Sequence, residues 1–238
     1  MNRPTRAEVS IANLRNNFEI VRSLVDRDVQ IMAMVKANAY GHGIVRVSEE
    51  LLKAGAHYIG VAYLEEVVFL RENGITAPIL VLGAINTEQV ADFINFDIEI
   101  TSSSLEKSRA ISQMAKAMGK TARVHLKIDT GMERIGVHWY NAQRFTGETL
   151  AMENIDVRGI FSHLAKAEDD SQFTQTQVSR FEEIVNNMEK DGTRPGLVHL
   201  ANSAGIINFK SSHFNMVRPG IMLYGYNPNG YLPDVSFN

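Results

Sequence analysis

The 238-residue sequence contains no cysteine. Disulfide bonds, thiolate catalysis and metal sites built on cysteine are therefore excluded. The sequence also has no apolar run near the ~20 residues that a membrane-spanning helix requires. The N-terminal segment 1–10 is polar and lacks the apolar core of a signal peptide. We therefore expect a cytoplasmic protein that does not bind a membrane.

Charge of one sign is also not in excess, since 24 Lys and Arg stand against 27 Asp and Glu, for a formal net charge of −3. The basic residues are scattered, so no run of them indicates a nucleic-acid partner. The seven histidines show no spacing typical of a metal site. A hydrophobic content of 45% indicates a globular protein with a sizeable core. Length alone is compatible with one large domain or two small ones.

Eight short β-rich runs are present, and helical patterns separate them. The runs are 31–35, 58–62, 79–82, 98–101, 122–128, 155–161, 197–200 and 215–217. Near-continuous apolar runs of this kind are typical of buried parallel strands. Eight strand–helix units over roughly 200 residues predict an α/β fold, a (β/α)8 barrel of the TIM type. The rival is an open doubly wound sheet, which more often carries a G-x-G-x-x-G turn that is absent here.

The helical segments show apolar residues at steps of three and four. Segment 14–25 follows a possible cap at Ser10, and segment 178–188 has one apolar face. A third helix is expected from the serines at 102–104 to Gly119, where glycine would end it. We assign residues 1–226 to the barrel. Residues 227–238, rich in Pro and Gly, are assigned to the start of a linker.

Catalytic groups in such barrels lie at the carboxyl ends of the strands. Lys36 closes the first apolar run, and partial burial there would lower its pKa because desolvation disfavours the ammonium. A neutral amine is what a Schiff base requires. The residue alone leaves open a second interpretation, in which the stem packs on the strand end and the amine lies in water.

Other strand ends carry polar groups as well. The run 122–129 alternates, so that Arg123, His125 and Lys127 share one face and need partners inside a barrel. Lys127 and Arg134 together indicate an anion site, with a solvated strand end as the alternative. His163 follows the sixth run, at a position where a histidine is more often structural than catalytic.

The loops after the seventh and eighth strands usually hold a phosphate group in these barrels. Ser203 lies in the first of these loops and Gly220 in the second. A hydroxyl and the closely approaching backbone N–H groups around a glycine are suitable donors for phosphate. We therefore expect a phosphorylated ligand.

Four strings appear in one order along the chain: MVKANAYGHG at 34–43, KIDTGMERIG at 127–136, ANSA at 201–204 and RPGIMLYG at 218–225. Together they resemble alanine racemase over essentially the whole chain. The resemblance implies pyridoxal 5′-phosphate as the cofactor and alanine as the substrate. It also implies a homodimer, and a role in supplying D-alanine for the cell wall. Serine as the substrate is left open.

The resemblance also implies roles for individual residues. Lys36 would carry the cofactor as a Schiff base and act as one of two acid/base groups. Arg134 would reach the cofactor's phenolic oxygen and the substrate carboxylate, and His163 would pack against the pyridine ring. Lys127 is carbamylated in some members and then positions the arginine. The remaining cofactor-binding positions are Tyr40, Asn202, Ser203, Gly220, Ile221 and Tyr224, of which Tyr40, Ser203, Gly220 and Ile221 would hold the phosphate.

Arg218 would face the pyridine nitrogen in this family. A guanidinium group only donates hydrogen bonds and stays protonated, so the ring nitrogen must accept and remain unprotonated. An unprotonated ring is a weaker electron sink, which favours return of the proton to the substrate over transamination. The cofactor supplies the difficult chemistry and the protein selects among its outcomes.

Racemisation needs proton transfer on both faces of the substrate carbon, and Lys36 serves one. In the family the opposite base is a tyrosine from a second, β-rich domain of the partner subunit, which would follow Asn238. We therefore expect this chain to bind the cofactor and to racemise little or not at all. An artificially shortened chain is favoured over a natural short form. The alternatives are a non-catalytic pyridoxal-phosphate homeostasis barrel, a decarboxylase barrel and a barrel without cofactor.

Overall fold

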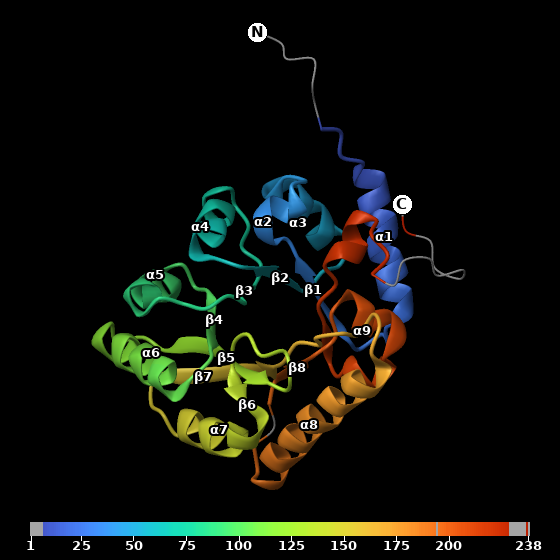
Figure 1. Ribbon diagram of the computed structural model, residues 1–238. Helices are drawn as coiled ribbons and strands as arrows, with labels where there is room; N and C mark the ends of the chain where they lie inside the picture. The colour runs from blue at the N-terminus through green and yellow to red at the C-terminus, as the bar shows by residue number, and fades with distance from the viewer. Residues whose placement is uncertain (1–6, 194, 229–236, 238) are drawn as a thin grey trace.

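The computed structural model describes residues 7–193, 195–228 and 237 of the chain. Eight parallel strands form a closed ring at the centre, and helices surround it (Figure 1). The ring runs in the order β1–β2–β3–β4–β5–β7–β8–β9, and pairing of β9 with β1 closes it. This closure confirms the predicted (β/α)8 barrel and excludes the open doubly wound sheet.

The strands of the ring match the eight predicted runs to within one residue at either end. Their bounds are β1 (Gln30–Met34), β2 (Tyr58–Val61), β3 (Ile79–Val81), β4 (Glu99–Ser102), β5 (Ala122–Asp129), β7 (Ile155–Phe161), β8 (Leu197–His199) and β9 (Met216–Val217). A further two-residue strand, β6 (Val137–His138), was not predicted and pairs with the end of β5 outside the ring.

The three helices that the apolar periodicity and the capping residues predict are all present. Ser10 accepts a hydrogen bond from the N–H of Asn13, and Ser104 accepts one from Lys107. The bounds are α1 (Ile11–Leu24), α2 (Lys36–Tyr40), α3 (Ile44–Lys53), α4 (Leu64–Glu72), α5 (Val90–Asn95), α6 (Leu105–Ala117), α7 (Ala142–Leu150), α8 (Ser171–Lys190) and α9 (Ser203–Asn208). Short 3₁₀ turns are η1 (Thr87–Gln89), η2 (Trp139–Asn141), η3 (Lys210–Ser212) and η4 (Ile221–Tyr224).

Helix α1 precedes the first strand, and it covers the place where a helix after the last strand would lie. It packs against α3, α9 and η4 (Figure 1). The side-chain amide of Asn17 donates a hydrogen bond to the carbonyl of Leu223, which fastens the two ends of the barrel together. None of the helices in the described ranges is long and apolar enough to cross a membrane.

The core has two layers, because successive residues of a barrel strand face opposite sides. In β1, Ile31 and Ala33 pack against the helices, whereas Met32 and Met34 belong to a separate cluster inside the ring. Full burial of each large apolar side chain contributes about 1.5–3 kcal/mol. The predicted linker 227–238 lies almost wholly outside the described residues, so its assignment stays a prediction.

Candidate active site

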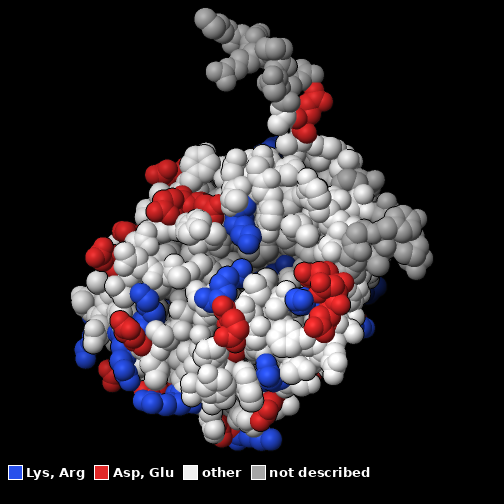
Figure 2. Space-filling view, in the orientation of Figure 1, with Lys and Arg blue, Asp and Glu red and all other residues white. Residues whose placement is uncertain are grey.

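A cavity of about 650 Å³ opens at the carboxyl ends of the strands. Figure 2 shows the hollow at the centre of this face, with Lys and Arg side chains on more than one side of it. The cavity brings together ten of the residues singled out in the sequence: Lys36, Tyr40, Lys127, Arg134, His163, Asn202, Ser203, Arg218, Gly220 and Ile221. Segments far apart in the chain therefore meet where the barrel fold places catalytic groups.

Lys36 begins a turn that the sequence pattern did not predict. Residues 37–40 all have φ between +53° and +55°, the left-handed region. Each such non-glycine residue costs roughly 1–2 kcal/mol. The turn is held by hydrogen bonds from the N–H of Gly41 to Ala37 and Asn38, and by Asn38, whose side chain accepts from Ile44. Strain of this kind is concentrated at functional sites, where the surrounding structure maintains it.

The turn holds the Lys36 side chain half-buried in the cavity wall. Burial lowers the pKa of its amine, and the positive charge of Arg134 lowers it further, while Glu66 acts in the opposite direction. A larger fraction of the amine is therefore neutral and nucleophilic than for a lysine in water. The geometry opposes the alternative of an amine lying free in solvent.

Tyr40 and Tyr224 form a pair beside the lysine, with ring centroids 4.8 Å apart. The Tyr224 hydroxyl donates to the carbonyl of Met34 at 2.9 Å, and Tyr224 is not part of the cavity wall. Burial raises the pKa of both tyrosines, so both hydroxyls remain protonated donors. The structure thus places Tyr224 behind Tyr40, where it supports the ring of Tyr40.

Ser203 and Gly220 adjoin each other on the cavity wall. The N–H of Gly220 donates to the Ser203 hydroxyl at 3.0 Å. A Cβ atom at position 220 would lie 2.8 Å from the hydroxyl oxygen of Tyr40, so glycine leaves the space between them. Asn202 caps α9, with its side-chain oxygen accepting from Gly205. The wall therefore carries the hydroxyl groups of Ser203 and Tyr40, which are donors of the kind that bind anions.

Arg218 is 3% exposed and fixed by its two terminal nitrogens. They donate to His199 Nδ1 and to the carbonyls of Ser162 and Leu200. Burial lowers the pKa of Arg218 to about 9, which leaves it charged at neutral pH. Burial also holds the pKa of His163 well below its usual value, and the charge of Arg218 adds to this effect. His163 is therefore neutral.

Lys127 is buried at 2% exposure, so its interpretation as part of a solvated strand end is wrong. Its amine donates to the carbonyl of Ile128 and lies 5.0 Å from the ring centroid of Phe161. Burial lowers the pKa of Lys127 to about 7, and the charge of Arg218 contributes. Arg134 lies exposed at the cavity entrance. The side chains thus form a cationic wall with one amine near half-protonation at neutral pH.

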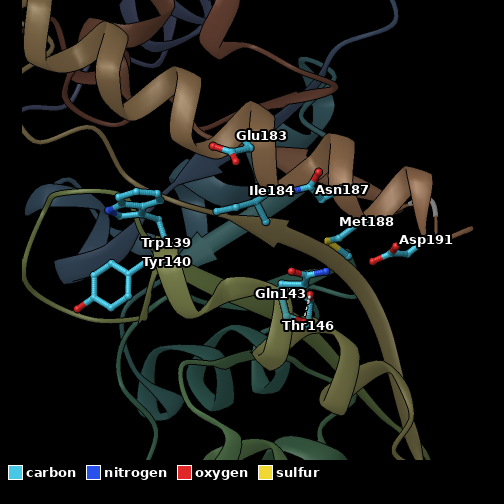
Figure 3. Close-up of a pocket in the computed structure, with 9 residues that line it drawn as sticks. All are labelled: Trp139, Tyr140, Gln143, Thr146, Glu183, Ile184, Asn187, Met188 and Asp191. Carbon is cyan, nitrogen blue, oxygen red and sulfur yellow. Dashed lines mark hydrogen bonds between the residues drawn. The ribbon is translucent and has the colours of Figure 1, made fainter.

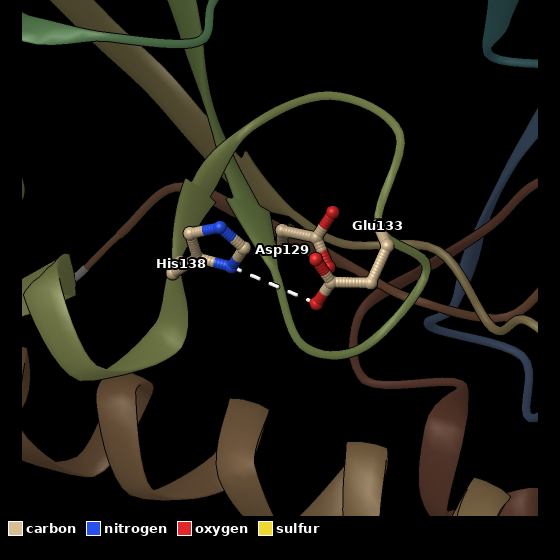
Figure 4. A group of neighbouring side chains, drawn as sticks. All are labelled: Asp129, Glu133 and His138. Carbon is tan, nitrogen blue, oxygen red and sulfur yellow. Dashed lines mark ion pairs between the residues drawn. The ribbon is translucent and has the colours of Figure 1, made fainter.

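Asp129, Glu133 and His138 gather beside β5, as Figure 4 shows. The oxygens of Asp129 accept hydrogen bonds from the backbone N–H groups of Gly131, Met132 and Arg134. Although burial acts to raise the pKa of Asp129, backbone hydrogen bonds from the loop and the charge of Lys127 outweigh it and lower the pKa. The carboxylate therefore braces the loop that carries Arg134, and Glu133 pairs with His138 at the surface, 3.7 Å apart.

A smaller cavity of about 240 Å³ lies between α7 and α8 (Figure 3). Trp139 and Tyr140 stand at one end, and the guanidinium of Arg180 lies 4.8 Å from the ring centroid of Trp139. None of the candidate cofactor-binding or catalytic residues named from the sequence lines it. The larger cavity is the candidate active site.

Known proteins resemble this chain in sequence. Residues 9–228 match the family model described as alanine racemase, N-terminal domain. The chain is 40% identical to alanine racemase of Methanococcus maripaludis over 231 residues, 95% of this chain and 61% of that protein. It is 41% identical to alanine racemase of Geobacter sp. strain M21, over 96% of this chain and 62% of that protein. The chain thus spans about three-fifths of the length of these relatives.

Solved structures agree with the sequence comparison. Alanine racemase of Clostridium difficile 630, in a complex with cycloserine, superposes with a TM-score of 0.95 at 36% identity, covering 100% of this chain and 66% of that one. Alanine racemase of Bacillus anthracis with bound L-Ala-P gives a TM-score of 0.89 at 33% identity, covering 96% and 59%. By its fold, its cavity and its match over residues 9–228, the chain belongs to the alanine racemase N-terminal domain family.

Proposed function

We propose that this chain is the pyridoxal-phosphate-binding barrel of a racemase that interconverts L- and D-alanine. The observation that carries the proposal is the meeting of Lys36, Ser203, Gly220 and Arg218 around one cavity. Similarity to alanine racemases, two of them solved with cycloserine and with L-Ala-P, supports alanine as the substrate.

The residues present fit the cofactor. The Ser203 hydroxyl accepts from the Gly220 N–H and keeps its own proton to donate to a phosphate, and the space that a Cβ at position 220 would fill lies beside the Tyr40 hydroxyl. Arg218 has a guanidinium Nε that hydrogen-bonds to no other described residue, and it suits an acceptor such as the ring nitrogen. When bound, pyridoxal phosphate supplies an electron sink for the charge that forms at the substrate α-carbon.

The chain's own residues then have distinct tasks. Lys36 would hold the cofactor through its neutral amine, and it would hold or return a proton at the substrate α-carbon on one face. Arg134, at the entrance, binds the substrate carboxylate. Arg218 would donate a hydrogen bond to the ring nitrogen, which as an acceptor would stay unprotonated. His163, which is neutral, packs beside the ring as the resemblance implies.

Lys127 is suited to carbamylation, which occurs in some members of the family. A pKa of about 7 leaves much of its amine neutral near pH 7, and only a neutral amine adds to carbon dioxide. A carbamate there would replace a buried cation by an anion within the cationic wall. It would thereby hold the guanidinium of Arg134.

Borohydride reduction tests the attachment. Loaded with pyridoxal phosphate and reduced, the chain should keep the cofactor on a single peptide that contains Lys36. Lys36→Ala should lose that adduct, whereas Lys53→Ala, at an exposed lysine of α3, should retain it. An equal amount of adduct in Lys36→Ala would refute the proposal.

Deuterium exchange tests the catalytic half. We expect the second base to come from outside this barrel, as in the family, so Lys36 alone should exchange the α-hydrogen of one alanine enantiomer in heavy water. The other enantiomer should exchange far more slowly, with little racemisation. If neither enantiomer exchanged its α-hydrogen, a non-catalytic cofactor-binding barrel would be favoured instead.

A further inference from the structure

Four buried polar side chains form a continuous row inside the barrel, which we call the interior chain: Arg218, His199, His125 and Glu99. Arg218 donates from a terminal nitrogen to His199 Nδ1 at 2.7 Å. His199 Nε2 lies 2.9 Å from His125 Nδ1, and His125 Nε2 lies 2.6 Å from Glu99 Oε2. Each of the four is at most 3% exposed. A guanidinium is thus joined to a carboxylate through two imidazoles.

The hydrogen bonds of the interior chain run in one direction only. Because a guanidinium can only donate, Nδ1 of His199 must accept, and the proton of that ring is on Nε2. Nδ1 of His125 must then accept, so its proton is also on Nε2 and is donated to Glu99. Both imidazoles are therefore neutral, since a second proton on either ring would set two donors against each other.

Glu99 supplies the negative end of the interior chain. The Tyr58 hydroxyl donates to Glu99 Oε1 at 3.3 Å, and Arg158 Nε lies 3.8 Å from the same oxygen. Within the described ranges, no Asp or Glu oxygen lies within 4.0 Å of the Arg218 guanidinium. A buried charge requires hydrogen bonds and a compensating charge. Here the compensation reaches Arg218 through His199 and His125.

The neighbouring strands leave space for the interior chain. Gly159 of β7 lies opposite His125 in the sheet register, and a Cβ at that position would lie 2.8 Å from His125 Nδ1. The register of β5 against β7 also shifts between Val124 and His125, an irregularity that re-aims side chains. The Phe161 ring stacks on His199 with centroids 4.8 Å apart. Both imidazoles are therefore held in place by packing.

We infer that Glu99 is a positioning residue, which acts through His125 and His199 to hold Arg218 with its Nε toward the cavity. The inference rests on the proposed function, in which Arg218 donates to the ring nitrogen of pyridoxal phosphate. If either imidazole reversed its protonation, a ring N–H would face the arginine. The guanidinium would then turn away from its present position.

Nitrogen-15 NMR of the histidine side chains tests the interior chain without cofactor. We expect His125 and His199 to be neutral with the proton on Nε2. Glu99→Gln supplies an amide that donates as well as accepts. Rings with the proton on Nδ1 then become accessible, and the signals of both histidines should shift. Glu50→Gln is the matched control, because Glu50 is also 1% exposed but pairs with Arg15 and Arg46 on the outside of the barrel.

Two results would overturn the inference. One is a doubly protonated or Nδ1-protonated ring at either histidine in the unaltered chain. The other is a Glu99→Gln chain whose His199 signals equal those of the unaltered chain. A chain that fails to bind pyridoxal phosphate would refute the proposed function, whereas the histidine signals would still decide the interior chain.

Cofactor binding provides a second readout. Glu99→Gln should weaken pyridoxal-phosphate binding about tenfold, comparable to weakening one hydrogen bond to a charged group, and should move the signal of a nitrogen-15-labelled pyridine ring. Glu50→Gln should change neither. His199→Gln keeps an acceptor for Arg218 and a donor for His125, so it should lose less affinity than His199→Leu. Equal losses in these two variants would show that His199 only fills space.

Discussion

On the side formed by β1, β2 and β3, the barrel interior is filled by apolar side chains such as Met32, Met34 and Leu80. Around β4 and β5 and at the end of β8 it holds Glu99, His125, Lys127 and His199 instead, all nearly inaccessible to solvent. Tyr58 joins the two sides, since its ring packs with the methionines and its hydroxyl donates to Glu99.

The two sides are stabilised by different physical means. The apolar side gains free energy from removal of surface from water, which depends on volume more than on identity. The polar side is stable only while its donors and acceptors match, because an unpaired buried group costs about 1–3 kcal/mol. The polar side also extends to the cavity through Arg218, so the same matching orients the groups proposed to bind the cofactor.

The largest expected effect comes from breaking the polar side at Arg218. Arg218→Met leaves His199 Nδ1 and the carbonyls of Ser162 and Leu200 without their donor. We expect the free energy of unfolding to fall by about 3–5 kcal/mol. Urea denaturation measures this free energy. A loss well below about 3 kcal/mol would contradict the hydrogen bonding described for Arg218.

Lys127 tests the polar side with the opposite expected sign, a gain of stability. Among the described residues its amine makes one hydrogen bond, and burial lowers its pKa to about 7. Lys127→Met should stabilise the fold by about 1–4 kcal/mol at pH 7. Between pH 7 and 10.5 the Lys127 amine is protonated in the unfolded chain and neutral in the folded chain. The free energy of unfolding therefore falls as the pH drops from about 10.5 to 7.

The stabilisation by Lys127→Met should therefore be greatest at pH 7 and shrink as the pH rises toward 10.5. Denaturation of both chains at several pH values, in buffer freed of carbon dioxide, checks this. A difference that does not change with pH would contradict the lowered pKa.

Gly159 tests how closely the interior is packed around the histidines. A Cβ in Gly159→Ala would lie 2.4 Å from the carbonyl oxygen of Leu197 and 2.8 Å from His125 Nδ1. We expect a loss of about 1–3 kcal/mol in thermal or chemical unfolding. Gly147→Ala in α7 is the matched control, since nothing lies within 4 Å of its added Cβ, and helix propensity should make it neutral or stabilising.

The smallest effect is expected on the apolar side. Met32→Leu conserves volume approximately, and no hydrogen bond among the described part of the chain involves the Met32 side chain. The change in the free energy of unfolding should stay below about 1.5 kcal/mol, and pyridoxal-phosphate binding should remain as in the unaltered chain. A loss as large as that of Arg218→Met would remove the distinction between the two sides.

Much of the fold could be predicted from the sequence because its signals are local. The apolar runs locate all eight strands of the ring, and Ser10 and Ser104 locate two helix starts. The cavity residues could also be predicted, because strand ends and the four family strings identify them. Their roles stay predictions until a ligand is seen.

The remaining features depend on contacts between distant segments. Ala37, Ala39 and Tyr40 carry no signal of a left-handed turn, which only their surroundings impose. His125 and His199 lie 74 residues apart, and Glu99 stands within a run that otherwise resembles an ordinary strand. Polar residues at inward positions of three predicted strands indicated that the barrel interior holds polar groups. Which of them hydrogen-bond to each other could be seen only in the closed ring.

A crystal structure of the chain grown with pyridoxal phosphate tests the central claim most directly. We expect electron density continuous with Nζ of Lys36, a phosphate group against Ser203 and Gly220, and the ring nitrogen facing Nε of Arg218. A cofactor bound to another lysine, or a Lys36 side chain in solvent with the cavity empty, would contradict it.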